Sequence, residues 1–315
     1  MVSSMRRRLV CGVGALLATA AGAATLAMGA ASASTDVTQP AGITVPGNSA
    51  GAPAVLVASL EGRNEVSGGA VAGRALELIG IQGDTLSYSV SWRGVGAPTE
   101  AAIHSGASGV DGPVVVPLFT KSPAGGSASG SVTVTDSALL TALRSNPGDF
   151  YSELRSTNSP QGAVRAQLHQ LTNPVATSGV AALQESVVVG AQIYACTPQA
   201  NGSFAFTQFG VDAHLSGGIH HTFVQPAAGP PQWQAPDGSA VTGKVVAKNA
   251  NGAGNIAELN LDATQIGASS GLLGHVVEVL RLNTVGGVAP AGTCDPQATP
   301  TVNVPYQADY IFING

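Results

Sequence analysis

Residues 85–92 read TLSYSVSW, and this short stretch decides the fold class of the chain. Apolar and aromatic side chains occupy every second position from Leu86 to Trp92, with serines between them. Strict alternation with a period of two is typical of a β-strand that buries one face. Residues 131–135 and 164–168 alternate in the same way, whereas the uninterrupted apolar run 113–119 predicts an interior strand.

One short segment has a helical pattern instead. Residues 137–144 carry an apolar stripe of three leucines, and Asp136 stands where a helix N-cap is expected. Asn146-Pro147-Gly148 follows and predicts the end of the helix.

A second set of strand patterns occupies the C-terminal half. The predicted strands are 186–195, 203–209, 241–248, 274–283 and 304–312. In the last of these, Tyr306, Ala308, Tyr310 and Phe312 share one face. No repeat relates the two halves. We therefore expect an all-β chain with two antiparallel, β-sandwich-like domains in tandem and one short helix in the first.

Segments rich in Gly, Pro and small polar residues set the expected boundaries. Residues 34–53 form a flexible leader, 54–171 the first domain, 172–184 a linker, and 185–315 the second domain.

The first 33 residues have the pattern of a secretory signal peptide. Arg6–Arg8 give a positive start, an almost uncharged run follows to Met28, and Ala31-Ser32-Ala33 supplies a cleavage signal before Ser34. A retained membrane anchor is the alternative, but several glycines interrupt the apolar run. We expect export by the Sec or the twin-arginine route, to a location outside the cell or at the cell wall.

Composition excludes two classes of partner. Charged residues make up 10% of a chain with a net charge of −5, and no basic cluster could neutralise several phosphates, so nucleic acid is not an expected partner. No apolar run after the signal peptide is long enough to span a membrane.

Two cysteines, Cys196 and Cys294, remain after the expected cleavage. In an oxidising compartment such a pair is expected to form a disulfide. A metal or redox pair is the alternative, but it favours closer spacing or histidine partners.

Several motifs resemble catalytic signatures without the required context. The G-x-S-x-G pattern at 47–51 and at 267–271 lacks the flanking strand and helix of a nucleophile elbow. Residues 238–244 nearly spell a phosphate-binding loop, but Val245 stands where a hydroxyl would hold Mg²⁺. We expect no dinucleotide-binding fold, no catalytic residue and no cofactor.

The histidines offer two weak candidate metal sites. His104 with Glu65 is one, and His214, His220 and Asp237 form the other. His220 and His221 are adjacent, so in a strand they face opposite sides and cannot share one ion. Structural histidines are the alternative interpretation.

Trp233 lies beside the turn sequence Asp237-Gly238-Ser239. An exposed Trp on a turn-rich loop is a common anchor for a sugar or a protein partner, so Trp233 is a candidate ligand-binding residue. The alternative is a Trp that closes one end of the core.

The first domain contains LEGRNEV (60–66), AAIHSG (101–106) with GPVVVPL (112–118), and SPQGAVRAQL (159–168). Over residues 54–171 it resembles the CHRD family. The resemblance implies an extracellular antiparallel β-sandwich that, in chordin, contacts a protein ligand. The family usually has further histidines where this chain has Ala102 and Arg155, so His104 stands alone.

The second domain contains YACTP (194–198), PQWQAPDGS (231–239), RLNTVGGVAP (281–290) and VPYQADY (304–310). Over residues 185–313 it resembles domain-of-unknown-function family 3455, which is found in secreted bacterial and fungal proteins.

Together these features predict a secreted, non-enzymatic binding or cell-envelope-associated protein whose partner is an extracellular protein or a glycan. The alternative is an extracellular metal-binding protein or metal-dependent enzyme.

Overall fold

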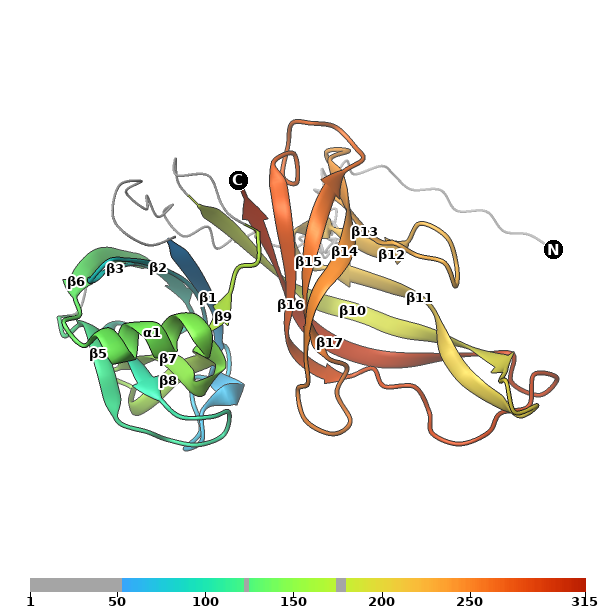
Figure 1. Ribbon diagram of the computed structural model, residues 1–315, viewed down its shortest axis with the longest axis horizontal. Helices are drawn as coiled ribbons and strands as arrows, with labels where there is room; N and C mark the ends of the chain where they lie inside the picture. Colours follow the sequence, from blue (N-terminus) through green and yellow to red (C-terminus); the bar gives the residue numbers. More distant parts are fainter. Residues whose placement is uncertain (1–52, 122–124, 174–179) are drawn as a thin grey trace, which may run out of the picture. The chain divides into compact units, whose positions relative to one another are not determined.

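A computed structural model describes residues 53–121, 125–173 and 180–315 (Figure 1). The expected signal peptide with its cleavage site at Ala33 and Ser34, nearly all of the leader, and residues 174–179 of the linker lie outside the described residues. Antiparallel strands dominate the structure, in two consecutive sheets, which confirms the predicted all-β class. Within the described residues no helix is long and apolar enough to cross a membrane.

The first sheet has nine strands in the order β5-β4-β7-β8-β1-β2-β3-β6, with β9 paired to β1. Their bounds are β1 Ala54–Glu61, β2 Arg74–Gln82, β3 Thr85–Arg93, β4 Pro98–Ser105, β5 Val114–Phe119, β6 Ser127–Thr133, β7 Phe150–Ser156, β8 Ser159–Gln167 and β9 His169–Gln170. The sheet curls around a core to which β3 contributes Leu86, Tyr88, Val90 and Trp92, the face predicted from their alternation (Figure 1).

Strand β5 differs from the expectation of an interior strand. It lies at one edge of the sheet, and Val114 and Pro117 are exposed. The physical reason lies in its prolines: Pro113 and Pro117 have no N–H to give to a second neighbouring strand, so an edge position is the stable one.

The predicted helix is present as α1, Ser137–Ser145. The Asp136 carboxylate accepts hydrogen bonds from the backbone N–H groups of Ala138 and Leu139, at 2.9 and 3.0 Å. Leu140 and Leu143 are buried against the first core. Short 3₁₀ turns flank the strands at Gly62–Asn64, Pro147–Asp149 and Ser216–Gly218.

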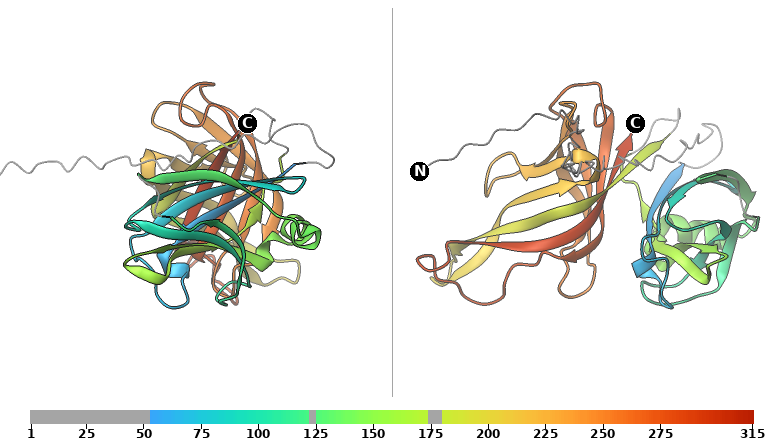
Figure 2. Two further views of the ribbon diagram at one scale, coloured as in Figure 1. Left: turned by 90° about the vertical axis from the view of Figure 1, so that its left-hand side faces the viewer. Right: turned by 180° about the vertical axis from the view of Figure 1, so that it is seen from behind.

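The second sheet closes on itself as a barrel, so the sandwich-like arrangement expected for this half takes the form of one continuous wall. Its strands are β10 Ala181–Pro198, β11 Phe204–Leu215, β12 His220–Phe223, β13 Pro231–Gln234, β14 Ala240–Asn249, β15 Glu258–Gln265, β16 Val276–Gly286 and β17 Thr301–Asn314. Strands β10 and β17 are the longest and pair side by side to close the barrel (Figure 2). Strand β10 begins at Ala181, inside the segment expected to be a linker.

Residues on the outer side of β16 and β17 contact the first sheet. Leu280 and Ile311 join a buried apolar cluster with Leu78 of β2. Beside it, the Asp309 carboxylate accepts a hydrogen bond from the Ser59 hydroxyl at 2.7 Å. The outer face of this part of the barrel is therefore covered by the first sheet.

The predicted disulfide between Cys196 and Cys294 is present and closes a loop with a sequence separation of 98. It ties the end of β10 to the segment that precedes β17. The bond therefore joins the two regions of chain that close the barrel.

Replacing both cysteines, Cys196→Ser with Cys294→Ser, is expected to lower the free energy of unfolding by about 4–5 kcal/mol in the chain-entropy model. Urea denaturation of the double variant and of the oxidised parent measures the difference. A change below about 1 kcal/mol would mean that the bond does not restrict the unfolded chain as its loop length implies.

Glu77 is a buried acid that forms no ion pair with any described residue. It lies on the core face of β2 with 0% exposure, and the neighbouring group that affects its pKa by hydrogen bonding is the Ser152 hydroxyl. Burial raises its pKa from 4.5 to about 7. Because the folded protein binds this proton more tightly than the unfolded chain does, Glu77 adds to the free energy of unfolding at low pH. The full contribution is present below the unfolded-state pKa of 4.5, and it is lost as the pH rises through 7.

The Glu77 carboxyl is therefore expected to make the free energy of unfolding of the parent about 2.5 kcal/mol higher at pH 5 than at pH 8, and Glu77→Gln is expected to lose this contribution. Denaturant titrations at the two pH values test this, with Asp84→Asn, an exposed turn carboxyl of the same domain, as the control. Equal pH dependence in the parent and Glu77→Gln would show that Glu77 is ionised in the folded protein.

Candidate ligand-binding cavity

The interior of the barrel is built by alternation along its strands. Tyr306, Ala308, Tyr310 and Phe312 of β17 are all buried in the barrel core, on the one face predicted for them. The tyrosines form a pair inside the barrel, with their hydroxyl oxygens 3.1 Å apart.

An aromatic cluster of His221, Trp233, Tyr310 and Phe312 lies inside the barrel. His221 of β12 and Trp233 of β13 are paired in register, and their rings stack at 4.5 Å between centroids and 3° between planes. Tyr310 meets both rings edge-on, at 5.0 and 5.5 Å, and Phe312 meets Trp233 at 6.2 Å. As predicted for adjacent residues in a strand, His221 faces inward and is 2% exposed, whereas His220 is on the other side.

Trp233 is not the exposed loop residue that the sequence analysis considered. It lies on a strand and is 1% exposed, because the cross-strand pairing of β12 and β13 turns it into the barrel. Gly243 of β14 makes room for the indole, since a Cβ there would lie 2.9 Å from Cζ3 of Trp233.

A cavity of about 520 Å³ adjoins this cluster. Aliphatic and aromatic side chains predominate in its lining, which consists of Gln192, Tyr194, Gln208, Val211, His221, Phe223, Pro231, Trp233, Val245, Lys248, Asn255, Ile256, Ala257, Leu259, Leu261, Arg281, Val288, Ala289 and Tyr310. A preformed, mostly apolar hollow with a few polar groups is the usual form of a small-molecule site.

Two buried polar atoms of this lining have no hydrogen-bond partner among the residues that the structure describes. They are Nε1 of Trp233 and Nε2 of Gln192, and both are donors. Leaving a buried donor unpaired costs about 1–3 kcal/mol.

The charge of the lining is entirely positive. Arg281 and Lys248 contribute to it and no Asp or Glu does, although the chain as a whole has a net charge of −5. The Arg281 guanidinium donates to the backbone oxygen of Ala257 at 2.7 Å, and it has no ion pair with any carboxylate of the described chain. An anionic group would supply the missing counter-charge.

The other titratable groups of the cavity stay neutral near pH 7. Burial lowers the pKa of His221 to about 3, and its Nδ1 hydrogen donates to the backbone oxygen of Gln232 at 2.9 Å. Burial also raises the pKa values of Tyr194 and Tyr310 above the usual 10. The guanidinium of Arg281 therefore remains the dominant charge next to the aromatic cluster.

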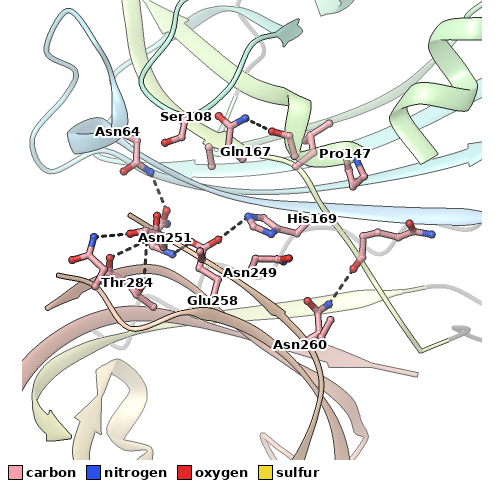
Figure 3. A pocket seen from close by; sticks show the side chains of 18 of the residues that line it. Asn64, Ser108, Pro147, Gln167, His169, Asn249, Asn251, Glu258, Asn260 and Thr284 are labelled. Carbon is pink, nitrogen blue, oxygen red and sulfur yellow. Dashed lines mark hydrogen bonds and ion pairs between the residues drawn. The ribbon is translucent and has the colours of Figure 1, made fainter. Parts of the chain in front are cut away.

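A second, polar cleft of about 770 Å³ is lined by residues of both domains (Figure 3). Most of its amide groups already bind protein atoms: Asn64 donates to Asn283, Asn251 to Thr284, and Asn260 to Glu278. Nε2 of His169 lies 3.6 Å from Oε2 of Glu258 (Figure 3). Because its donors are committed, this cleft has fewer free groups for a ligand than the barrel interior.

The predicted pairing of His104 with Glu65 is not formed. His104 lies 3.8 Å from Glu153 and its Nδ1 is 3.0 Å from the backbone oxygen of Gly112. No hydrogen bond or ion pair joins it to Glu65 in the described parts of the chain, and the two do not belong to a cluster of three potential metal ligands.

The other predicted metal group is present with one member changed. His214 and His220 come together, but their acidic neighbour is Asp212 and not Asp237. Asp237 instead accepts hydrogen bonds from Ser239 and from the backbone N–H of Leu272. The sequence contained the signal, since Asp212 and His214 are two residues apart and therefore share one face of a strand.

The catalytic-like motifs lie in settings without an adjacent helix in the described residues. Residues 267–271 belong to the loop between β15 and β16, and residues 238–244 comprise a turn and the first half of β14. Residues 47–51 lie outside the part of the chain that the structure describes.

Comparison with protein families finds two matches, in the order expected. Residues 56–168 match the CHRD domain, and residues 217–314 match the family described as protein of unknown function (DUF3455). Neither is a known enzyme family. No curated protein and no solved structure matches the chain. The cavity is lined largely by residues inside the second match.

The contact between Gly243 and Trp233 predicts a specific steric effect. Gly243→Ala is expected to destabilise the protein by about 1–3 kcal/mol, because the added methyl group must displace the indole or Leu261. Gly210→Ala is the matched control, since a Cβ there meets nothing closer than 3.9 Å. Thermal unfolding of both variants measures the difference, and equal effects would place the indole elsewhere.

Proposed function

We propose that the protein is an extracellular, non-enzymatic binding protein whose C-terminal barrel holds a small, mostly apolar molecule with an anionic group such as a carboxylate. One observation carries the proposal: the cavity, which opens to the surface beside Val245 and Val288, is mostly apolar and aromatic, and its charged lining residues are Arg281 and Lys248 with no acid among them.

The size and polarity of the cavity support this class of ligand. A volume of about 520 Å³ falls within the range of roughly 300–1,000 Å³ that holds drug-sized molecules. The unpaired N–H groups of Trp233 and Gln192 are hydrogen-bond donors, like the positively charged side chains of the lining. All of these groups favour a ligand that carries hydrogen-bond acceptors. A hydroxyl-rich glycan would leave the apolar surface of Tyr310 and Phe223 unmatched.

The lining also favours binding over catalysis. It holds no Ser, Thr, Cys, Asp or Glu that could act as a nucleophile or a carboxylate base. His221, the one histidine, is a weak base with a pKa of about 3.

An extracellular location is the inference from two features. The Cys196–Cys294 disulfide is stable in oxidising compartments, and the first 33 residues have the pattern of an export signal. A role for the CHRD domain in contacting an extracellular protein or the cell envelope remains compatible with ligand binding in the barrel.

Two fluorescent probes with the same apolar body test the proposal. We expect 1-pyrenebutyric acid, a carboxylate at neutral pH, to bind about ten times more tightly or better than 1-pyrenebutanol, since a charge-assisted hydrogen bond contributes about 1.5–3 kcal/mol. Arg281→Met is expected to remove most of this preference. Arg144→Gln, which alters a half-buried arginine of α1 in the first domain, is expected to retain it.

Val288→Trp provides a second variant that leaves Arg281 in place. Val288 lines the cavity but is 43% exposed, so a larger side chain there should obstruct the cavity without disturbing the core. We expect loss of binding of both probes with unchanged thermal stability. Binding of neither probe to the parent, or equal binding of the acid and the alcohol, would contradict the proposal.

A further inference from the structure

We propose that Asp212, His214 and His220 form a binding site for a divalent transition-metal ion of the zinc and copper class. The three residues lie on the outer side of β11 and β12, away from the cavity lining, so the site is independent of the proposed ligand. It is the one group of three or more His, Cys, Asp or Glu side chains in the described ranges whose ligand atoms lie within 4.8 Å of one another.

The backbone holds the three side chains together on one face. His214 and His220 are directly paired in the register of β11 and β12. Asp212 is two residues before His214 and therefore points the same way. The short turn Ser216–Gly218 joins the two strands, so the hairpin fixes all three positions locally.

The distances leave only a small adjustment for a metal ion. The His214 and His220 rings are parallel, with centroids 4.6 Å apart, and Nε2 of His220 is 2.8 Å from Oδ1 of Asp212. Zinc binds imidazole nitrogen and carboxylate oxygen at about 2.0–2.2 Å. An ion between them therefore requires the hydrogen bond of His220 to Asp212 to open and the two rings to turn out of their stack. Asp212 and His214 are exposed and His220 is half-buried, so these rotations meet little packing resistance.

The donor set selects the class of ion. Two imidazoles with one carboxylate suit zinc, copper and related ions, whereas Ca²⁺ and Mg²⁺ prefer oxygen ligands alone. Three protein ligands leave a coordination position for water or another molecule. Asp212 pairs with no Lys or Arg among the described residues, so its carboxylate is available to the ion.

The surroundings add polar groups to the site. On the same outer face, His220 is paired with Gln234 of β13, and Asp212 with Thr222 of β12. The amide oxygen of Gln234 is a neutral metal ligand of the type that occupies a fourth coordination position.

Isothermal titration of the chelator-treated protein with Zn²⁺, and separately with Cu²⁺, tests the site. We expect one ion per chain, with His214→Ala and His220→Ala each weakening the affinity by roughly tenfold or more. His275→Ala, which removes an exposed histidine outside the cluster, is the matched control and should bind as the parent does.

A spectroscopic readout separates ligation from a general change in the protein. Electron paramagnetic resonance of the Cu²⁺ complex should show coupling to nitrogen in the parent and in His275→Ala, and reduced coupling in His214→Ala. Circular dichroism of each variant establishes that it is folded. No binding of either ion, or equal losses in the control and the cluster variants, would overturn the proposal, and neither outcome bears on binding of pyrenebutyric acid in the barrel.

Discussion

The pairing of β10 with β17 is the constraint on which the second domain depends. Each of these strands also pairs with a second neighbour, β11 or β16, so the wall has no free edge. Closure divides every strand into an inner and an outer face. The disulfide joins Cys196, near the end of β10, to Cys294, in the segment before β17. It keeps these two parts of the chain together in the unfolded state as well.

Closure explains why one sequence pattern gives two chemically different surfaces. His221 and Trp233 face inward and stack, whereas their neighbours His220 and Gln234 face outward. Inside, burial keeps His221 and the tyrosines neutral. Arg281 stands beside these rings, and in the described part of the chain no carboxylate forms an ion pair with it. Outside, the imidazoles and Asp212 remain accessible. The hairpin of β11 and β12 thus contributes His221 to the cavity on its inner face and the cluster of Asp212, His214 and His220 on its outer face.

Local sequence patterns predicted where the strands lie. They did not predict which residues the pairing of distant strands turns into the barrel. The alternation around Trp92 and Tyr310, the cap Asp136 and the disulfide were all predictable, since each depends on neighbouring residues or on a simple pair. The cavity was not, because β12, β13 and β15 are short or lack clear alternation and the barrel register sets Trp233 inward. Arg281 was missed for the same reason, since only the closed wall shows which side of β16 is the inside.

The most direct measurement of ligand binding in the barrel uses the two indole N–H signals of the protein, which has only two tryptophans. Trp233 lines the cavity with an unpaired Nε1, while Trp92 lies in the core of the first domain. In a ¹⁵N-correlated NMR spectrum assigned with Trp92→Phe, pyrenebutyric acid should shift the Trp233 indole signal and leave that of Trp92 in place. An unmoved Trp233 signal at saturating probe would contradict a ligand site inside the barrel.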